Sequence, residues 1–219
     1  GIAAGCKDGA AGGDRALGGA DGLGCLQVAA GGGAVFEDAP AKAFNLGREG
    51  AQVLAIRLTA TSTPLWQELS LLKEHGLYVR KALALLEAAS EPCPRVQIDL
   101  KLALGSSCYH TQGGTPETIE AFVSARTLAR QCNDIAGQLR AVSGHMAVNL
   151  CCADYQMALE QSQQFDRLGL HGDATLSLST QRLRVLALHF AGDQAQARMN
   201  AEQVLQRMTQ SGHLNRFTH

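Results

Sequence analysis

One residue pattern returns every 39 positions through the last two-thirds of the chain. It is carried by apolar positions (Leu100, Leu139 and Leu178) and by turn positions (Gly114, Ala153 and Gly192). A fixed period of this size is typical of an array of helical repeats, in which each unit buries its apolar face only against its neighbours. Such arrays offer long surfaces for binding, so the period favours a binding protein over an enzyme.

The spacing of apolar residues predicts a series of helices from residue 51 onward. Three helix pairs have first helices at 95–112, 134–151 and 173–191 and second helices at 116–132, 154–169 and 193–209. Earlier helices are expected at 51–62, at 64–75 between a Thr63 cap and a Gly76 stop, and at 77–89, before a break at Pro92 and Pro94. We therefore expect an all-α domain over 51–210, a right-handed superhelix of about four antiparallel helix pairs.

Residues suited to capping stand where these helices begin. Thr115 is followed by Pro116, the order that favours a helix start. Aspartates, which accept hydrogen bonds from free backbone N–H groups, stand at the other starts: Asp134, Asp154, Asp173 and Asp193.

Small residues at matched positions predict close contacts between the helices. Gly105 and Gly144 lie one period apart in the first helices, whereas the third copy has Leu183. The last two second helices read small, small, large: Ala158/Ala197, Ser162/Ala201 and Phe165/Val204. Small side chains let helices approach, and the large one fills the space between them.

The first 50 residues have a different composition, because they hold 14 of the 24 glycines and many alanines. Glycine costs a helix about 1 kcal/mol relative to alanine, and few large apolar residues are present to offset the ordering entropy. We expect residues 1–50 to be a low-complexity or disordered segment, and residues 211–219 to be a tail.

Charge and hydropathy exclude several classes of protein. The net charge is −1 with a pI near 6.7, which argues against direct nucleic-acid binding. No apolar run is long enough to cross a membrane, and no signal peptide is evident. The seven cysteines in a chain of 219 residues favour reduced, mostly buried thiols, so a cytoplasmic location is expected.

Three kinds of chemical site are disfavoured by the motifs. Gly31, Gly32 and Gly33 have no following lysine, so they do not form a phosphate loop. No serine stands in a G-x-S-x-G turn, and no catalytic residue or cofactor is expected. The residues that would ligate a metal lack the usual spacing: Cys108, His110, Cys151, Cys152 and His189. The cysteines among them are interpreted as buried structural residues at contacts between helices.

A short basic row is the best candidate for a binding site. Lys101 and Arg140 lie one period apart on successive first helices, with Ser179 at the third position. First helices often line the concave face of a solenoid, where basic side chains would hold an acidic peptide. The alternative is a solvated edge. Trp66, the single tryptophan, is expected to anchor the core of the first helix pair.

Two stretches carry a family resemblance: PLWQELSLLKEHGLYVRKALALLEA at 64–88 and LKLALGSSCYHTQGGTPETIEAFVSARTLARQCND at 100–134. The chain resembles tetratricopeptide-like repeats of the kind found in large bacterial signal-transduction ATPases linked to DNA-binding or cyclase domains. The resemblance implies a non-catalytic regulatory scaffold that binds a protein or peptide, including an ATPase or DNA-binding domain of the same parent chain. The chain departs from that family because it has no G-x-x-x-x-G-K-[ST] loop. A free-standing adaptor and an enzyme or metal protein on a helical scaffold remain as alternatives.

Overall fold

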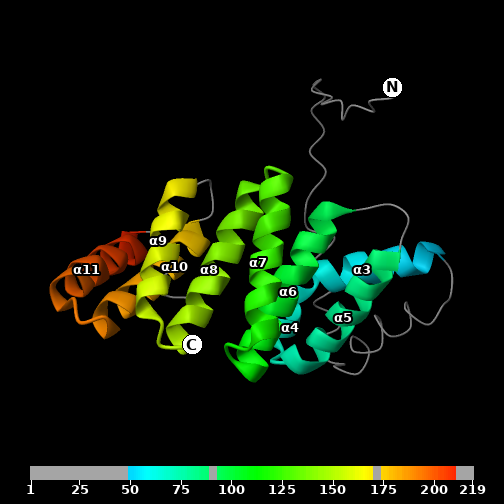
Figure 1. The fold of residues 1–219 in the computed structure, drawn as a ribbon, viewed down its shortest axis with the longest axis horizontal. Coiled ribbons are helices and arrows are strands. Elements are labelled where there is room, and N and C mark those ends of the chain that lie inside the picture. Colours follow the sequence, from blue (N-terminus) through cyan, green and yellow to red (C-terminus); the bar gives the residue numbers. More distant parts are fainter. Residues whose placement is uncertain (1–48, 89–92, 170–173, 211–219) are drawn as a thin grey trace, which may run out of the picture. The chain divides into compact units, whose positions relative to one another are not determined.

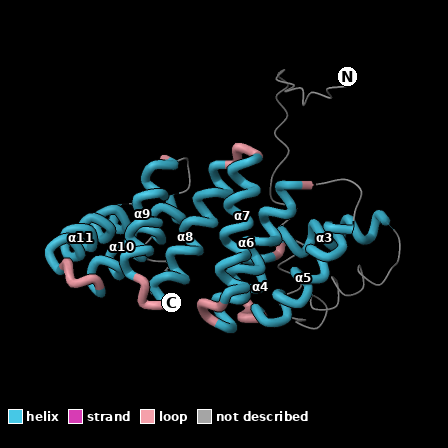
Figure 2. The backbone as a smooth tube through the Cα atoms, in the orientation of Figure 1, coloured by secondary structure: helices cyan, strands magenta, loops and turns pink. Residues whose placement is uncertain are grey.

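The computed structural model describes residues 49–88, 93–169 and 174–210, which all lie in one compact unit, Pro40–His219. The predictions for residues 1–48, for the cap at Asp173 and for the tail at 211–219 fall outside these ranges. Every element in the described residues is a helix, as expected for an all-α protein (Figure 1 and Figure 2). None of these helices is long and apolar enough to cross a membrane.

The helices follow one another with short connections. Their bounds are α3 (Glu49–Thr61), α4 (Thr63–Glu68), α5 (Leu72–Ala88), α6 (Pro94–Gln112), α7 (Pro116–Gln131), α8 (Ile135–Cys151), α9 (Tyr155–Leu168), α10 (Ala174–Phe190) and α11 (Gln194–Gln210). From α6 onward the predicted boundaries agree with the structure to within one or two residues.

Four of these helices begin at a capping side chain. The oxygens of Thr115, Asp134, Asp154 and Asp193 accept hydrogen bonds at 3.3, 2.9, 3.1 and 3.0 Å from the backbone N–H three residues further on. Each bond satisfies a donor that the first helical turn leaves free. The predicted caps at α7, α8, α9 and α11 are therefore confirmed.

The predicted break at Gly76 is wrong. Gly76 lies inside α5, and the chain instead turns at Ser70, whose φ is 58°. Gly76 is buried where a Cβ would lie 3.4 Å from that of Ser107 on α6. Gly76 therefore lies at an ordinary packing contact between α5 and α6 and does not end a helix.

The predicted cap at Thr63 is also wrong. Thr63 is the first residue of α4, and Ser62 takes the capping position without a side-chain cap bond. The Ser62 hydroxyl instead accepts a hydrogen bond at 3.0 Å from the indole N–H of Trp66.

Consecutive helices pack as neighbours from α5 to α11, and α6, α8 and α10 also touch one another in turn (Figure 1). The centre of the packing is Phe122 of α7, which is 5% exposed. Its ring lies between Gly105 of α6 and Gly144 of α8, and a Cβ at Gly105 would be 2.8 Å from the ring. The two matched glycines are therefore the places where α6 and α8 admit one aromatic ring.

Candidate functional site

A groove with a volume of about 810 Å³ runs across the first helices of the pairs. We call it the main groove. Its walls come from α3, α4, α6, α8 and α10, and the ring of Phe122 reaches it from α7. It lies where α6, α8 and α10 meet side by side, so several helices contribute to one continuous surface.

The main groove is lined by both apolar and polar residues. Apolar residues form much of the lining, including Leu102, Ala103, Ala147, Leu176 and Leu183. Polar residues lie among them: Thr61, Thr63, Gln67, Asp99, Ser106, Tyr109, His110, Arg140, Ser143 and Ser179. An apolar surface with a few placed polar groups is the usual character of a ligand-binding groove.

The two residues of the predicted basic row lie in different places. Arg140 lines the main groove, where its guanidinium forms an ion pair at 2.9 Å with Asp99 of α6. Lys101 is half-buried on α6 and is not among the groove-lining residues. The groove therefore presents an acid–base pair at this point rather than two basic side chains.

Sequence reasoning missed Asp99. The paired residues Asp99 and Arg140 lie 41 residues apart, whereas Ser143 and Thr180, which meet between the next two first helices, lie 37 residues apart. The 39-residue spacing matched Arg140 with Lys101 because it identifies equivalent positions in the repeats, not the positions that face each other between two helices.

Side-chain hydrogen bonds join neighbouring helices along the main groove. Gln67 of α4 donates to the hydroxyl of Ser106 on α6 at 3.0 Å. Thr180 of α10 donates to the hydroxyl of Ser143 on α8 at 2.9 Å. With the Asp99–Arg140 pair, these contacts fix the spacing of successive helices that form the groove wall.

Tyr109 and His110 also line the main groove, and their rings meet edge to face at 4.9 Å between centroids. The Tyr109 hydroxyl is 3.3 Å from the Sγ of Cys151. Burial, together with this contact, raises the pKa of Tyr109 to about 12. Its phenol is therefore protonated at neutral pH and available as a hydrogen-bond group.

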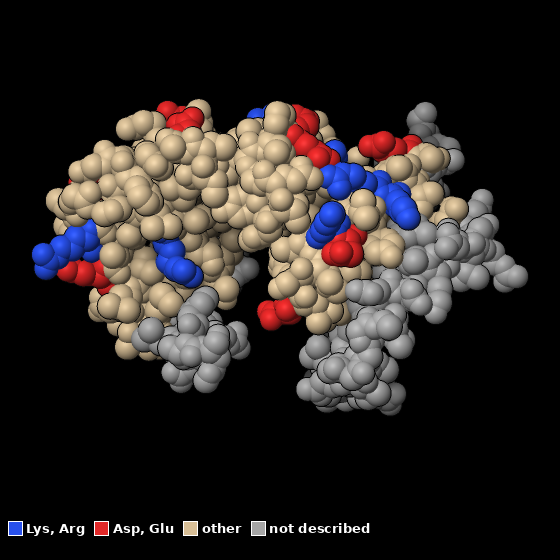
Figure 3. All heavy atoms as spheres, turned by 90° about the horizontal axis from the view of Figure 1, so that it is seen from below, with Lys and Arg blue, Asp and Glu red and all other residues tan. Residues whose placement is uncertain are grey.

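Charges on the molecular surface are mixed in sign. Figure 3 shows that basic and acidic side chains lie beside one another on one face, amid wide areas of uncharged residues. Besides Asp99–Arg140, the described residues form ion pairs between helices, at Arg80–Glu117 and Arg184–Asp166, and within α11, at Arg198–Glu202. This distribution agrees with the near-zero net charge and gives no continuous basic stripe on that face.

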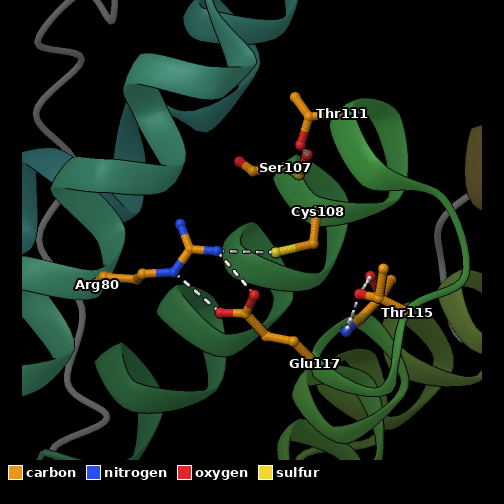
Figure 4. Close-up of polar contacts among 7 residues, drawn as sticks. Arg80, Ser107, Cys108, Thr111, Thr115 and Glu117 are labelled. Carbon is orange, nitrogen blue, oxygen red and sulfur yellow. Dashed lines mark hydrogen bonds and ion pairs between the residues drawn. The ribbon is translucent and has the colours of Figure 1, made fainter.

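A polar cluster away from the main groove joins α5, α6 and α7 (Figure 4). The Arg80 guanidinium donates two hydrogen bonds of 2.9 Å to the Glu117 carboxylate and approaches the Cys108 Sγ at 3.4 Å. Burial, and then the nearby Glu117 charge, raises the pKa of the Cys108 thiol. A reactive cysteine needs a lowered pKa, so this cluster joins helices rather than activating a nucleophile.

Among the cysteines that the structure describes, the expectation of mostly buried thiols is correct only for Cys108. It is wrong for Cys132, Cys151 and Cys152, which are exposed, and Cys93 is half-buried. Cys108 is 1% exposed, whereas both thiols at the end of α8 are exposed. Their sulfur atoms face the corner between α6 and α7, at the Tyr109 hydroxyl and the Gly114 carbonyl. A helix end lies at the surface, which explains their exposure. Within the described residues no three of His, Cys, Asp and Glu lie close enough to hold a metal ion.

A buried histidine completes the polar inventory. His75 is fully buried, its ring stacks on Trp66 at 5.5 Å, and its nitrogens contact the Thr59 carbonyl and the Ser107 hydroxyl at 3.3 Å each. Burial lowers the pKa of His75. Trp66 is 1% exposed, so its predicted role as a core anchor is confirmed. Ser107 is 2% exposed and His75 is fully buried, so a substrate cannot reach the His75–Ser107 pair.

Comparison with known proteins adds no identity to this geometry. No family model matches the chain, and neither a curated protein nor a solved structure matches it.

Proposed function

We propose that this protein is a non-catalytic interaction scaffold that holds a peptide segment of a partner protein in the main groove. The observation that carries the proposal is the groove itself, which has a volume of about 810 Å³ and is lined by apolar and polar residues from six helices. Apolar side chains of a bound segment would rest on the floor at Ala103 and Ala147, while its polar groups meet Ser106, Tyr109 and the Asp99–Arg140 pair.

We further propose that the described helices form a right-handed, tetratricopeptide-like superhelix with a 39-residue period. The caps Thr115, Asp154 and Asp193 support this arrangement because each lies one period after the one before it. So do the ends of α6, α8 and α10, at Gln112, Cys151 and Phe190. In such a fold the first helices line one face, and the main groove lies on them.

Binding of a selected peptide tests the scaffold proposal. Peptides are selected from a displayed random library on the whole chain, and their affinities are then measured by fluorescence anisotropy. Ala147→Arg places a charged side chain on the half-buried groove floor, whereas Glu160→Arg changes an exposed residue of α9 outside the groove. We expect about a tenfold loss of affinity for Ala147→Arg, equal to about 1.4 kcal/mol, and no loss for Glu160→Arg. Equal affinities for the two variants would contradict the proposal.

The basic row is tested with a pair of substitutions. Arg140→Ala removes a groove-lining cation, whereas Lys101→Ala removes one that does not line the groove. If Arg140 helps to bind an acidic segment, affinity falls for Arg140→Ala alone and the effect weakens in high salt. The assignment is refuted if Lys101→Ala loses affinity, or if both variants bind as well as the wild type.

We also propose that the scaffold belongs to a cytoplasmic bacterial regulatory protein, as a sensor region beside an ATPase. The resemblance of residues 64–88 and 100–134 supports this proposal. The full reading frame decides it: an upstream G-x-x-x-x-G-K-[ST] motif supports an ATPase parent, and a frame without one favours a free-standing adaptor.

A further inference from the structure

A second groove lies at the C-terminal end of the described helices, between α10 and α11. We call it the end groove. It has a volume of about 500 Å³. Its lining is mostly apolar and includes Val185, Leu186, Ala201, Val204, Leu205 and Met208, with Ser179 and Arg182 as the polar residues. Leu186 and Leu205 are 45% and 56% exposed. Large apolar side chains left this open mark a surface that binds another element.

In the helix pairs α6/α7 and α8/α9, the corresponding surface is covered by the first helix of the following pair. On α6 and α7 the covering helix is α8, which contacts them through Gly137, Ala141, Gly144 and Val148. On α8 and α9 the covering helix is α10, which contacts them through Leu176, Thr180, Leu183 and Ala187. Both sets follow the spacing i, i+4, i+7 and i+11, which is one stripe of an amphipathic helix. The two sets lie one period apart in the sequence.

The end groove repeats the surface that α10 covers. Three residues beneath α10 are Met146, Ser162 and Phe165, with exposures of 0%, 3% and 3%. The residues one period later are Val185, Ala201 and Val204, which line the end groove. Val185 and Ala201 are only half-buried, because none of the described helices covers them as α10 covers their counterparts. Because α10 covers the equivalent surface of the preceding pair, the end groove has the shape and polarity to bind a helix.

Two differences between the surfaces define the chemistry of that helix. Thr180 of α10 meets Ser143, and the end groove has Arg182 at the position equivalent to Ser143. Arg184 of α10 pairs with Asp166 at 2.9 Å, and the end groove has Leu205 at the position equivalent to Asp166. An acidic residue complements Arg182, and an apolar residue complements Leu205.

We propose that the end groove binds an amphipathic helix of a partner protein. Compared with α10, this helix has apolar or small residues at the positions equivalent to Leu176, Leu183 and Ala187. It has an acidic residue at the position equivalent to Thr180 and an apolar residue at the position equivalent to Arg184. This binding takes place in a second groove, although Ser179 and Leu183 of α10 line both grooves. The mode is a helix laid in an apolar groove, with the contacts at i, i+7 and i+11 giving affinity and the acid fixing the register.

The test uses a labelled synthetic peptide with the sequence of α10 that carries Thr180→Glu and Arg184→Leu. Its binding to the whole chain is measured by fluorescence anisotropy. Saturable binding is expected, and a peptide with Thr180→Lys in place of Thr180→Glu should bind at least about fivefold more weakly because it meets Arg182. Absence of binding, or equal binding of the two peptides, overturns the proposal.

Two variants on α11 localise the site. Leu205→Arg changes a groove-lining residue that is 56% exposed, and Met199→Arg makes the same change at a residue that is 50% exposed and outside the groove. We expect at least about a tenfold loss of affinity for Leu205→Arg and none for Met199→Arg, with unchanged circular dichroism for both. Equal loss in both variants refutes the site. Analytical ultracentrifugation tests whether a second copy of the chain binds the end groove instead. If the wild-type chain forms a dimer and Leu205→Arg dissociates it, the proposal of a partner helix is overturned.

Discussion

Gly144→Ala should destabilise this protein, although alanine is the better helix former. Gly144 lies within α8, and the ring of Phe122 occupies the space that a Cβ would need. The ring cannot move far toward α6, because a Cβ at Gly105 on that side would be only 2.8 Å from it. An added methyl group must therefore displace the ring or separate α6 from α8.

The size of the effect follows from two opposing contributions. Overpacking a closed core costs about 1–3 kcal/mol, and the close approach to several ring atoms places this site near 3 kcal/mol. Replacing a mid-helix glycine with alanine stabilises the helix by about 1 kcal/mol. The difference is a net loss of about 2 kcal/mol. For a domain of this size such a loss lowers Tm by about 4–8 °C.

Thermal unfolding followed by circular dichroism measures this loss, and Gly76→Ala is the matched control. Gly76 is also buried within a helix, but a Cβ there would meet its nearest neighbours at 3.4 Å, an ordinary contact distance. Gly76→Ala should therefore leave Tm unchanged or raise it. In a Phe122→Leu background, the smaller side chain should reduce the cost of Gly144→Ala. The reasoning is refuted if Gly144→Ala is as stable as the wild type, or if the cost is the same in both backgrounds.

Four further outcomes are expected. Asp154→Ala removes the cap on the Met157 N–H and should cost about 1 kcal/mol in urea unfolding. Burial lowers the pKa of His75 in the folded state, so the folded chain binds fewer protons than the unfolded chain. The free energy of unfolding should therefore fall as the pH drops below 6.5, the ordinary pKa of histidine. His75→Gln should weaken this dependence on pH. Iodoacetamide should modify Cys151 and Cys152 in the native protein and Cys108 only after unfolding, as read by mass spectrometry. Hydrogen exchange should be faster in α10 and α11 than in α8, because fewer of their residues are buried.

Helix boundaries after residue 94 were predictable because local signals fix them. A side-chain oxygen at Thr115 or Asp154 bonds to a backbone N–H three residues away, so the sequence around the cap determines the helix start. Gly76 misled the prediction because a glycine can either end a helix or lie inside a helix that packs against another. Only the position of Ser107 on α6 decides between them, and that contact is not local.

The main groove was only partly predictable for the same reason. Arg140 was identified from its place on a first helix, and it does line the groove. Its partner Asp99 depends on how α6 and α8 face each other, and it lies 41 residues before Arg140 rather than 39. A sequence period assigns equivalent positions within repeats, whereas side-chain contacts between repeats depend on how neighbouring helices are offset.

The helix α10 connects the two grooves, since Ser179 and Leu183 line both of them. A helix that docks in the end groove requires α10 to be folded against α8 and α9, so its binding stabilises α10 by mass action. The same folded α10 supplies one wall of the main groove through Ser179 and Leu183. Occupation of the end groove should therefore raise the affinity of the main groove for its peptide. Because coupling between binding sites is reciprocal, a peptide in the main groove should raise the affinity of the end groove by the same factor.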